Sequence, residues 1–220
     1  MFVLGVILEW FLIRPLKRDR TQLSILVTFA IAIIIEGVLT FFYGGEYVKL
    51  FAWYTTSSIP VGPFYLPDIY LLAFALSAVL LGALYFLLYL TKFGRSIRAT
   101  TQNRAAALLI GIDVERVAAL TFGIGVALTA AGGMAFGATT AFNPNSHYDL
   151  ISRLLVIVIF AGMGSVGGAL IAAVGMLVIE NVTALVLSPT WASTVFYVLL
   201  VLILLFRPQG LFGRAAARNQ

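Results

Sequence analysis

Long, nearly uninterrupted apolar runs alternate with short polar stretches along this chain. A helix that crosses about 30 Å of hydrocarbon needs roughly 20 apolar residues. Runs of about this length, and one that is slightly shorter, occur near Leu23–Tyr43, Ile69–Leu90, Val117–Thr140, Gly167–Leu187 and Trp191–Phe206. Two further apolar segments, Phe2–Ile13 and Leu150–Met163, are short for a span. The pattern therefore predicts an all-α, polytopic membrane helix bundle with about six to seven hydrophobic segments, one of them short or kinked.

The composition agrees with a membrane protein. Hydrophobic residues make up 61% of the chain, charged residues 10%, and the mean hydropathy is +1.04, whereas a soluble domain carries roughly 25% charged residues. We expect residues 1–220 to form one transmembrane domain. Cysteine is absent and there is a single histidine, so we expect no disulfide and no metal site. We also expect no cofactor, because the one glycine motif that resembles a dinucleotide-binding turn lies in an apolar span.

The basic residues indicate the orientation of the spans. Nearly all of the 14 Lys and Arg residues fall in three short groups, at residues 14–20, 92–116 and 207–218. Basic loops stay on the cytoplasmic side of a membrane, so an even number of crossings is expected between each pair of groups. Between residues 116 and 207 the number of crossings is four if Leu150–Met163 crosses the membrane, and two if Leu150–Leu187 makes no net passage. The basic tail, residues 207–220, is therefore predicted to be cytoplasmic, and nucleic-acid binding does not explain the net charge of +5.

A glycine cluster in "IVIFAGMGSVGGAL", Ile157–Leu170, follows the GxGxxG spacing of a dinucleotide-binding turn. That motif requires a helix with one face in water, but Glu180 is the only charged residue between Leu154 and Phe206. Glycines at such spacing in a membrane favour close helix packing or a kink. We assign helix packing or a kink, in preference to lining a substrate path, to Gly162, Gly164, Gly167, Gly168, Gly133 and Gly137.

Polar side chains inside the spans need partners. Glu36 interrupts "IAIIIEGVLT" and Glu180-Asn181 interrupts "MLVIENVTAL". A carboxylate at the bilayer centre costs about 2.5 kcal/mol or more. Glu36, Glu180 and Asn181 therefore either make interhelical hydrogen bonds or line a translocation pathway, and the sequence leaves both readings open.

The polar segment Lys92–Val117 is too long for a simple turn. Thr101 or Asn103 can cap a short helix over residues 105–109, Gly111 suits its C-terminal end, and Asp113 can cap the next span. This short helix is predicted to lie on the cytoplasmic face. Its apolar stripe either rests on the headgroups or meets a partner.

The residues "GRSIRATTQNRAAALLIGIDVERVAALTFGIGVALTAAGGMAFG", with "AGMGSVGGAL", "RPLKRDR" and "FRPQGLFG" elsewhere, closely resemble the permease subunits of branched-chain amino-acid ABC transporters. The resemblance implies a subunit of the cytoplasmic (inner) membrane that pairs with a second permease, two cytoplasmic ATPases and an extracytoplasmic solute-binding protein. The family's ATPase-coupling loop would fall at about residues 91–116. Its candidate contact residues are Arg95, Arg98, Arg104, Leu108, Leu109 and Gly111.

Two features qualify this expectation. Relatives carry further membrane helices before the region that matches Met1, including an Asn-Phe-Ala-His-Gly-like stretch, so we expect this chain to lack them. No Gly-Lys pair of a P-loop occurs, so the chain itself is expected not to be an enzyme that hydrolyses nucleotide. An ABC permease for urea or a short amide is an alternative. An ion-coupled secondary carrier fits less well, because we find no internal repeat and only two carboxylates within the spans.

Overall fold

The computed structural model describes residues 1–15, 20–49, 58–61, 64–162, 166–207 and 210. These residues form two compact units, Met1–Asn145 and Ser146–Gln220, and each is described by itself. Within these residues the fold is all-α, as the sequence predicts, apart from one short hairpin that was not predicted. Four helices of the described chain are long and apolar enough to cross a membrane: α2 from Ile25, α3, α6 and α8. Their large apolar side chains are mostly exposed, as expected where lipid rather than water surrounds a helix.

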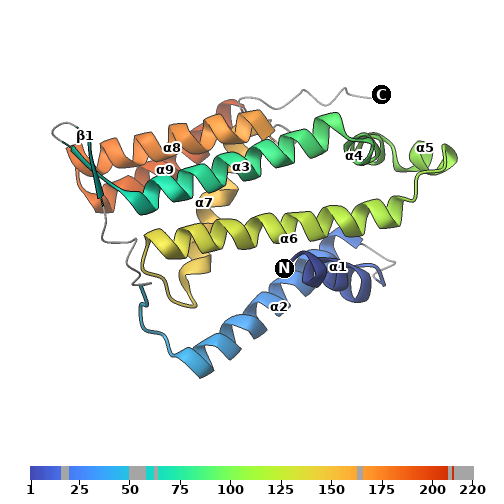
Figure 1. The fold of residues 1–220 in the computed structure, drawn as a ribbon, viewed down its shortest axis with the longest axis horizontal. Helices are drawn as coiled ribbons and strands as arrows, with labels where there is room; N and C mark the ends of the chain where they lie inside the picture. The colour runs from blue at the N-terminus through green and yellow to red at the C-terminus, as the bar shows by residue number, and fades with distance from the viewer. Residues whose placement is uncertain (16–19, 50–57, 62–63, 163–165, 208–209, 211–220) are drawn as a thin grey trace. The chain divides into compact units, whose positions relative to one another are not determined.

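The first unit is built on one long helix, α6. Its helices are α1 (Phe2–Leu8), the single π-helical turn η1 (Glu9–Ile13), α2 (Arg20–Tyr43), α3 (Asp68–Leu90), α4 (Lys92–Gln102), α5 (Arg104–Leu109) and α6 (Val114–Thr139). Helices α1, α3 and α4 all pack on α6. Helices α4 and α5 lie at one end of α3 and α6 (Figure 1). The hairpin pairs β1 (Ser58–Val61) with β2 (Phe64–Pro67), Ser58 opposite Pro67.

The two ends of the first unit are tied by different contacts. At one end, the Arg14 guanidinium forms an ion pair with the Glu115 carboxylate. At the other end, the Val48 and Phe142 backbones exchange two hydrogen bonds of 2.9 and 3.0 Å. The segments that follow α2 and α6 therefore meet at the end away from Arg14.

The second unit contains α7 (Ser146–Ala161), α8 (Val166–Val186) and α9 (Pro189–Phe206), with α8 and α9 side by side (Figure 1). Its core is formed by the buried side chains of Val156 and Met176, on which Phe160 and Leu199 pack. Val156 on α7 meets Met176 on α8, and Arg153 reaches Glu180. The two helices therefore run in opposite directions.

Helix α7 ends where the glycine cluster begins. Gly162 has a φ of +83°, a conformation that glycine adopts without strain and that stops a helix. A Cβ on Gly210 would collide with the Gly162 backbone and the Ile159 carbonyl. This contact brings the end of α7 beside the end of α9. Helix α7 therefore ends just before Gly162, on the same side of this unit as the end of α9.

Candidate functional site

Helix α4 is fastened to the end of α3. The Thr91 hydroxyl accepts a 3.0 Å hydrogen bond from the Gly94 N–H, which caps α4. The Arg98 guanidinium donates to the Leu88 carbonyl and lies 5.4 Å from the centre of the Tyr89 ring. Gly94 is buried, and a Cβ there would collide with the Leu87 and Leu88 carbonyls in the last turn of α3. Arg98 therefore has a role within the chain, which the sequence analysis did not anticipate.

Helix α5 forms as the capping pattern predicts. The Asn103 side chain accepts a 3.0 Å hydrogen bond from the Ala106 N–H, and Asp113 accepts one of 3.1 Å from the Arg116 N–H. Gly111 follows α5 with a φ of +83°. The Thr101 hydroxyl instead donates to carbonyls of its own helix. Of the two expected caps for α5, Asn103 is the one that forms.

Helix α5 presents an apolar surface. Ala107 is buried against the unit, whereas Leu108, Leu109 and the following Ile110 are 56, 88 and 73% exposed. Arg95 and Arg104 are also exposed. We call α4, α5 and Ile110 together the α4–α5 segment. It has two exposed leucines and two exposed arginines, and Arg98 holds its first helix to α3.

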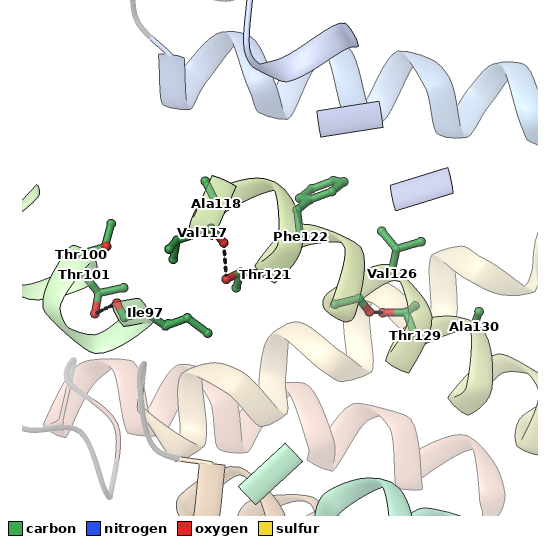
Figure 2. Close-up of a pocket in the computed structure, with 11 residues that line it drawn as sticks. Ile97, Thr100, Thr101, Val117, Ala118, Thr121, Phe122, Val126, Thr129 and Ala130 are labelled. Carbon is green, nitrogen blue, oxygen red and sulfur yellow. Dashed lines mark hydrogen bonds between the residues drawn. The ribbon is translucent and has the colours of Figure 1, made fainter. Parts of the chain in front are cut away.

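A groove of about 820 Å³ lies between α4 and α6 (Figure 2). Its lining residues include Ile97, Thr121, Phe122, Val126 and Thr129. The hydroxyls of Thr121 and Thr129 donate to carbonyls of α6, at 2.6 and 3.0 Å. Since these hydroxyls are engaged within their helix, the groove presents mainly methyl groups and aromatic carbon. It offers little to a polar solute.

The second unit contains a cluster of charged side chains that the sequence analysis missed. Arg153 Nη1 lies 2.6 Å from Glu180 Oε1, and Arg153 Nε lies 2.9 Å from Asp149 Oδ2. We call Asp149, Arg153 and Glu180 the charge cluster. Arg153 was overlooked because it immediately precedes the uncharged run that begins at Leu154. The available signal was a basic residue outside the three basic groups, 27 positions before a glutamate inside an apolar run.

The other polar candidates take separate places. Glu36 is half-buried on α2 of the first unit. The Asn181 amide is exposed and donates to the Leu177 carbonyl of its own helix at 2.7 Å. Glu180 forms an ion pair with Arg153. A pathway role for Glu36, Glu180 and Asn181 stays a prediction.

The glycines differ from one another in their surroundings. A Cβ on Gly137 would lie 2.9 Å from the Phe142 ring, whereas one on Gly133 or Gly167 would meet nothing within 4 Å. Gly168 is buried, and Gly164 lies outside the described residues. Packing of another helix at Gly133 and Gly167 stays a prediction. A close contact between two helices is found elsewhere, between Gly5 of α1 and Gly123 of α6.

Helices of membrane-spanning length with apolar surfaces, and charges gathered at their ends, define a multi-pass membrane protein of the α-helical class. Residues 1–205 match the family described as branched-chain amino acid transport system / permease component, and the chain belongs to this family.

Individual relatives support the same assignment. The chain is 34% identical to the high-affinity branched-chain amino acid transport system permease protein LivH of Salmonella typhimurium, over 56% of this chain and 41% of the relative. It is 24% identical to a probable LivH of Methanocaldococcus jannaschii, over 97% of this chain and 72% of the relative. It is also 31% identical to the autoinducer 2 import system permease protein LsrC of Klebsiella pneumoniae, over 61% of this chain and 41% of the relative.

The matched region spans about four-tenths of the length of the first curated relatives. No solved structure matches the chain significantly.

Proposed function

We propose that this chain is a membrane-spanning permease subunit of an ATP-driven importer for branched-chain or other small amino acids. It forms part of the translocation pathway in the cytoplasmic membrane. Its partners are a second permease subunit, cytoplasmic ATPase subunits and an extracytoplasmic solute-binding protein. Membership of the permease family supports the class. The single structural observation that carries the proposal is the α4–α5 segment with its exposed leucines.

The α4–α5 segment suits a mechanical link between an ATPase and the spans. Arg98 and Gly94 fix α4 against the end of α3, and α4 and α5 both pack against α6. A push on α5 is therefore passed to two long helices through short, rigid contacts. Alternating access requires such a link, because nucleotide-driven closure of the ATPases must change the packing of the bundle.

A second candidate differs only in the solute. The similarity to a permease protein of an autoinducer 2 import system favours a permease for another small solute within the same class. The two candidates are separated by uptake measurements with the assembled importer. Competition by excess unlabelled leucine, isoleucine or valine, but not by a non-amino-acid solute, supports the first.

Replacement of Leu108 tests the docking. A buried leucine contributes roughly 1.5–3 kcal/mol, whereas an exposed ion pair at a rim contributes about 0.2–1 kcal/mol. We therefore expect Leu108→Asp to abolish copurification of the ATPase and solute-stimulated ATP hydrolysis, and Arg104→Ala to weaken both only mildly. Gln102→Asp places the same charge on the exposed end of α4 and serves as the control. Normal association of Leu108→Asp would mean that α5 rests on the lipid headgroups instead.

A further inference from the structure

The charge cluster runs from the surface of the second unit into its interior. The exposed fraction of the side chain falls from 61% at Asp149 to 34% at Arg153 and 15% at Glu180. Arg153 is seven residues from the start of α7 and Glu180 six from the end of α8, so both lie about 10 Å from these helix ends at 1.5 Å per residue. The cluster is thus reached from the end of the unit opposite Gly162 and Gly210.

The inner end of the charge cluster contains a buried carboxylate oxygen that accepts no hydrogen bond from the described residues. Glu180 Oε1 accepts from Arg153, but Glu180 Oε2 is buried and has no hydrogen-bond partner within the part of the chain that the structure describes. Buried carboxylate oxygens are normally hydrogen-bonded, because desolvation without a partner is costly. Two carboxylates also face one guanidinium, so the cluster carries a net charge of −1. Both facts favour a cationic donor at Glu180 Oε2.

The outer end contains a replaceable anion. Asp149 is mostly exposed, and an ion pair in contact with water is weak. A guanidinium carries five donors in a planar fork that matches a carboxylate. A carboxylate that arrives from the surface can therefore take the place of Asp149 on Arg153, and Asp149 then turns to water.

We propose that the charge cluster holds the charged groups of a zwitterionic amino acid during its passage. The α-ammonium donates to Glu180 Oε2, and the α-carboxylate replaces Asp149 on Arg153. Each of the two charges of the solute then has a partner of opposite sign in the cluster. This inference rests on the proposed function and names the residues that recognise the solute.

A purely structural role would have different consequences. If Arg153 and Glu180 only tie α7 to α8, the exchanged pair Arg153→Glu with Glu180→Arg restores the tie and the activity, provided that Asp149→Asn accompanies it so that no two carboxylates face each other. If they hold a zwitterion, the exchanged pair restores folding but inverts the positions for ammonium and carboxylate. Transport is then lost in a correctly folded protein.

The experiment uses the complete importer, with its ATPase and binding protein, in proteoliposomes with labelled leucine. Because Glu180→Gln removes a charge-assisted hydrogen bond, we expect it to lower uptake roughly ten- to a hundredfold. We expect the exchanged pair to lower uptake by the same amount, while its thermal midpoint returns toward that of the unmodified complex. Thr183→Val is the control, because the Thr183 hydroxyl donates to Ile179 within α8 at 2.7 Å, one turn from Glu180. It should transport normally.

A binding measurement without the binding protein completes the test. Leucine should raise the thermal midpoint of the purified permease–ATPase complex, 3-methylbutylamine should raise it less, and 4-methyl-2-oxopentanoate should not raise it. Uptake by Glu180→Gln within twofold of the unmodified complex, or full activity of the exchanged pair, overturns the inference alone. An unmodified complex that neither takes up leucine nor is stabilised by it overturns the proposed function as well.

Discussion

Single glycines matter here where two backbones approach each other. A Cβ on Gly5 would lie 2.8 Å from the Gly123 Cα and 2.9 Å from the Val126 Cβ, and one on Gly123 would lie 2.6 Å from a Val6 methyl. Neither position has room for a side chain without movement of a neighbour. Lipid-facing helices associate through close packing at small residues, and this pair allows it for α1 and α6.

We predict that Gly123→Ala lowers the stability of the protein. Overpacking of this kind costs about 1–3 kcal/mol, whereas Gly125→Ala, where a Cβ meets nothing within 4 Å, should be neutral or stabilise α6 by roughly 0.5–1 kcal/mol. The thermal midpoint and the monodisperse yield in detergent measure both variants. Equal midpoints for the two would show that α1 does not pack closely on α6.

The sequence identified only part of this residue-level chemistry. Glu180 could be singled out, because a lone carboxylate in an apolar run is costly wherever it lies. Its partner Arg153 is on a different helix, and pairing across 27 residues depends on how α7 turns into α8. The Gly5–Gly123 contact was hidden for the same reason. Spacing along one helix does not show which neighbour that helix meets.

At the scale of elements, the spans were predicted closely. The predicted segments Leu23–Tyr43 and Ile69–Leu90 correspond to α2 at Arg20–Tyr43 and α3 at Asp68–Leu90. Apolar length alone determines such helices. Helix α4 and the β1–β2 hairpin were not predicted, because their sequences are short and polar or mixed. Helix α4 is held by Thr91, Gly94 and Arg98 against α3, which are contacts that no local pattern reveals.

Helix α5 has six residues, so its cap should matter. Loss of an N-cap side chain costs about 1 kcal/mol, which corresponds to a roughly fivefold change in an opening equilibrium. We therefore predict that Asn103→Ala speeds hydrogen exchange of the amides in residues 106–109 about fivefold. Thr101→Val should leave these amides unchanged, because the Thr101 hydroxyl donates within α4. Equal exchange in both variants would contradict the capping role of Asn103.

At the scale of the whole molecule, contacts within each unit agree with the distribution of basic residues. The Arg14–Glu115 ion pair joins the first basic group to the second, and the Val48–Phe142 bridge joins the two segments at the other end. In the second unit, Gly210 lies against Gly162, so the end of α7 lies beside the residue that follows α9 by four positions. We therefore predict that α7, with 16 residues or about 24 Å, crosses the membrane as a short span and is not re-entrant.

This arrangement predicts which positions an impermeant thiol reagent reaches in intact cells. The chain has no cysteine, so single cysteines give a clean signal. Cysteines at Gln102, on α4, and at Gly167, in the first turn of α8, should be shielded, because basic segments stay in the cytoplasm. One at Asn145, between α6 and α7, should react. Cysteines at Asp19 and Asn219, outside the described residues, should be shielded too.

A Cβ at Gly167 meets nothing within 4 Å, so the substitution is tolerated and labelling there is interpretable. Rapid labelling of Gly167 together with Asn145 would make α7 re-entrant, and labelling of Gln102 would reverse the orientation of the first unit.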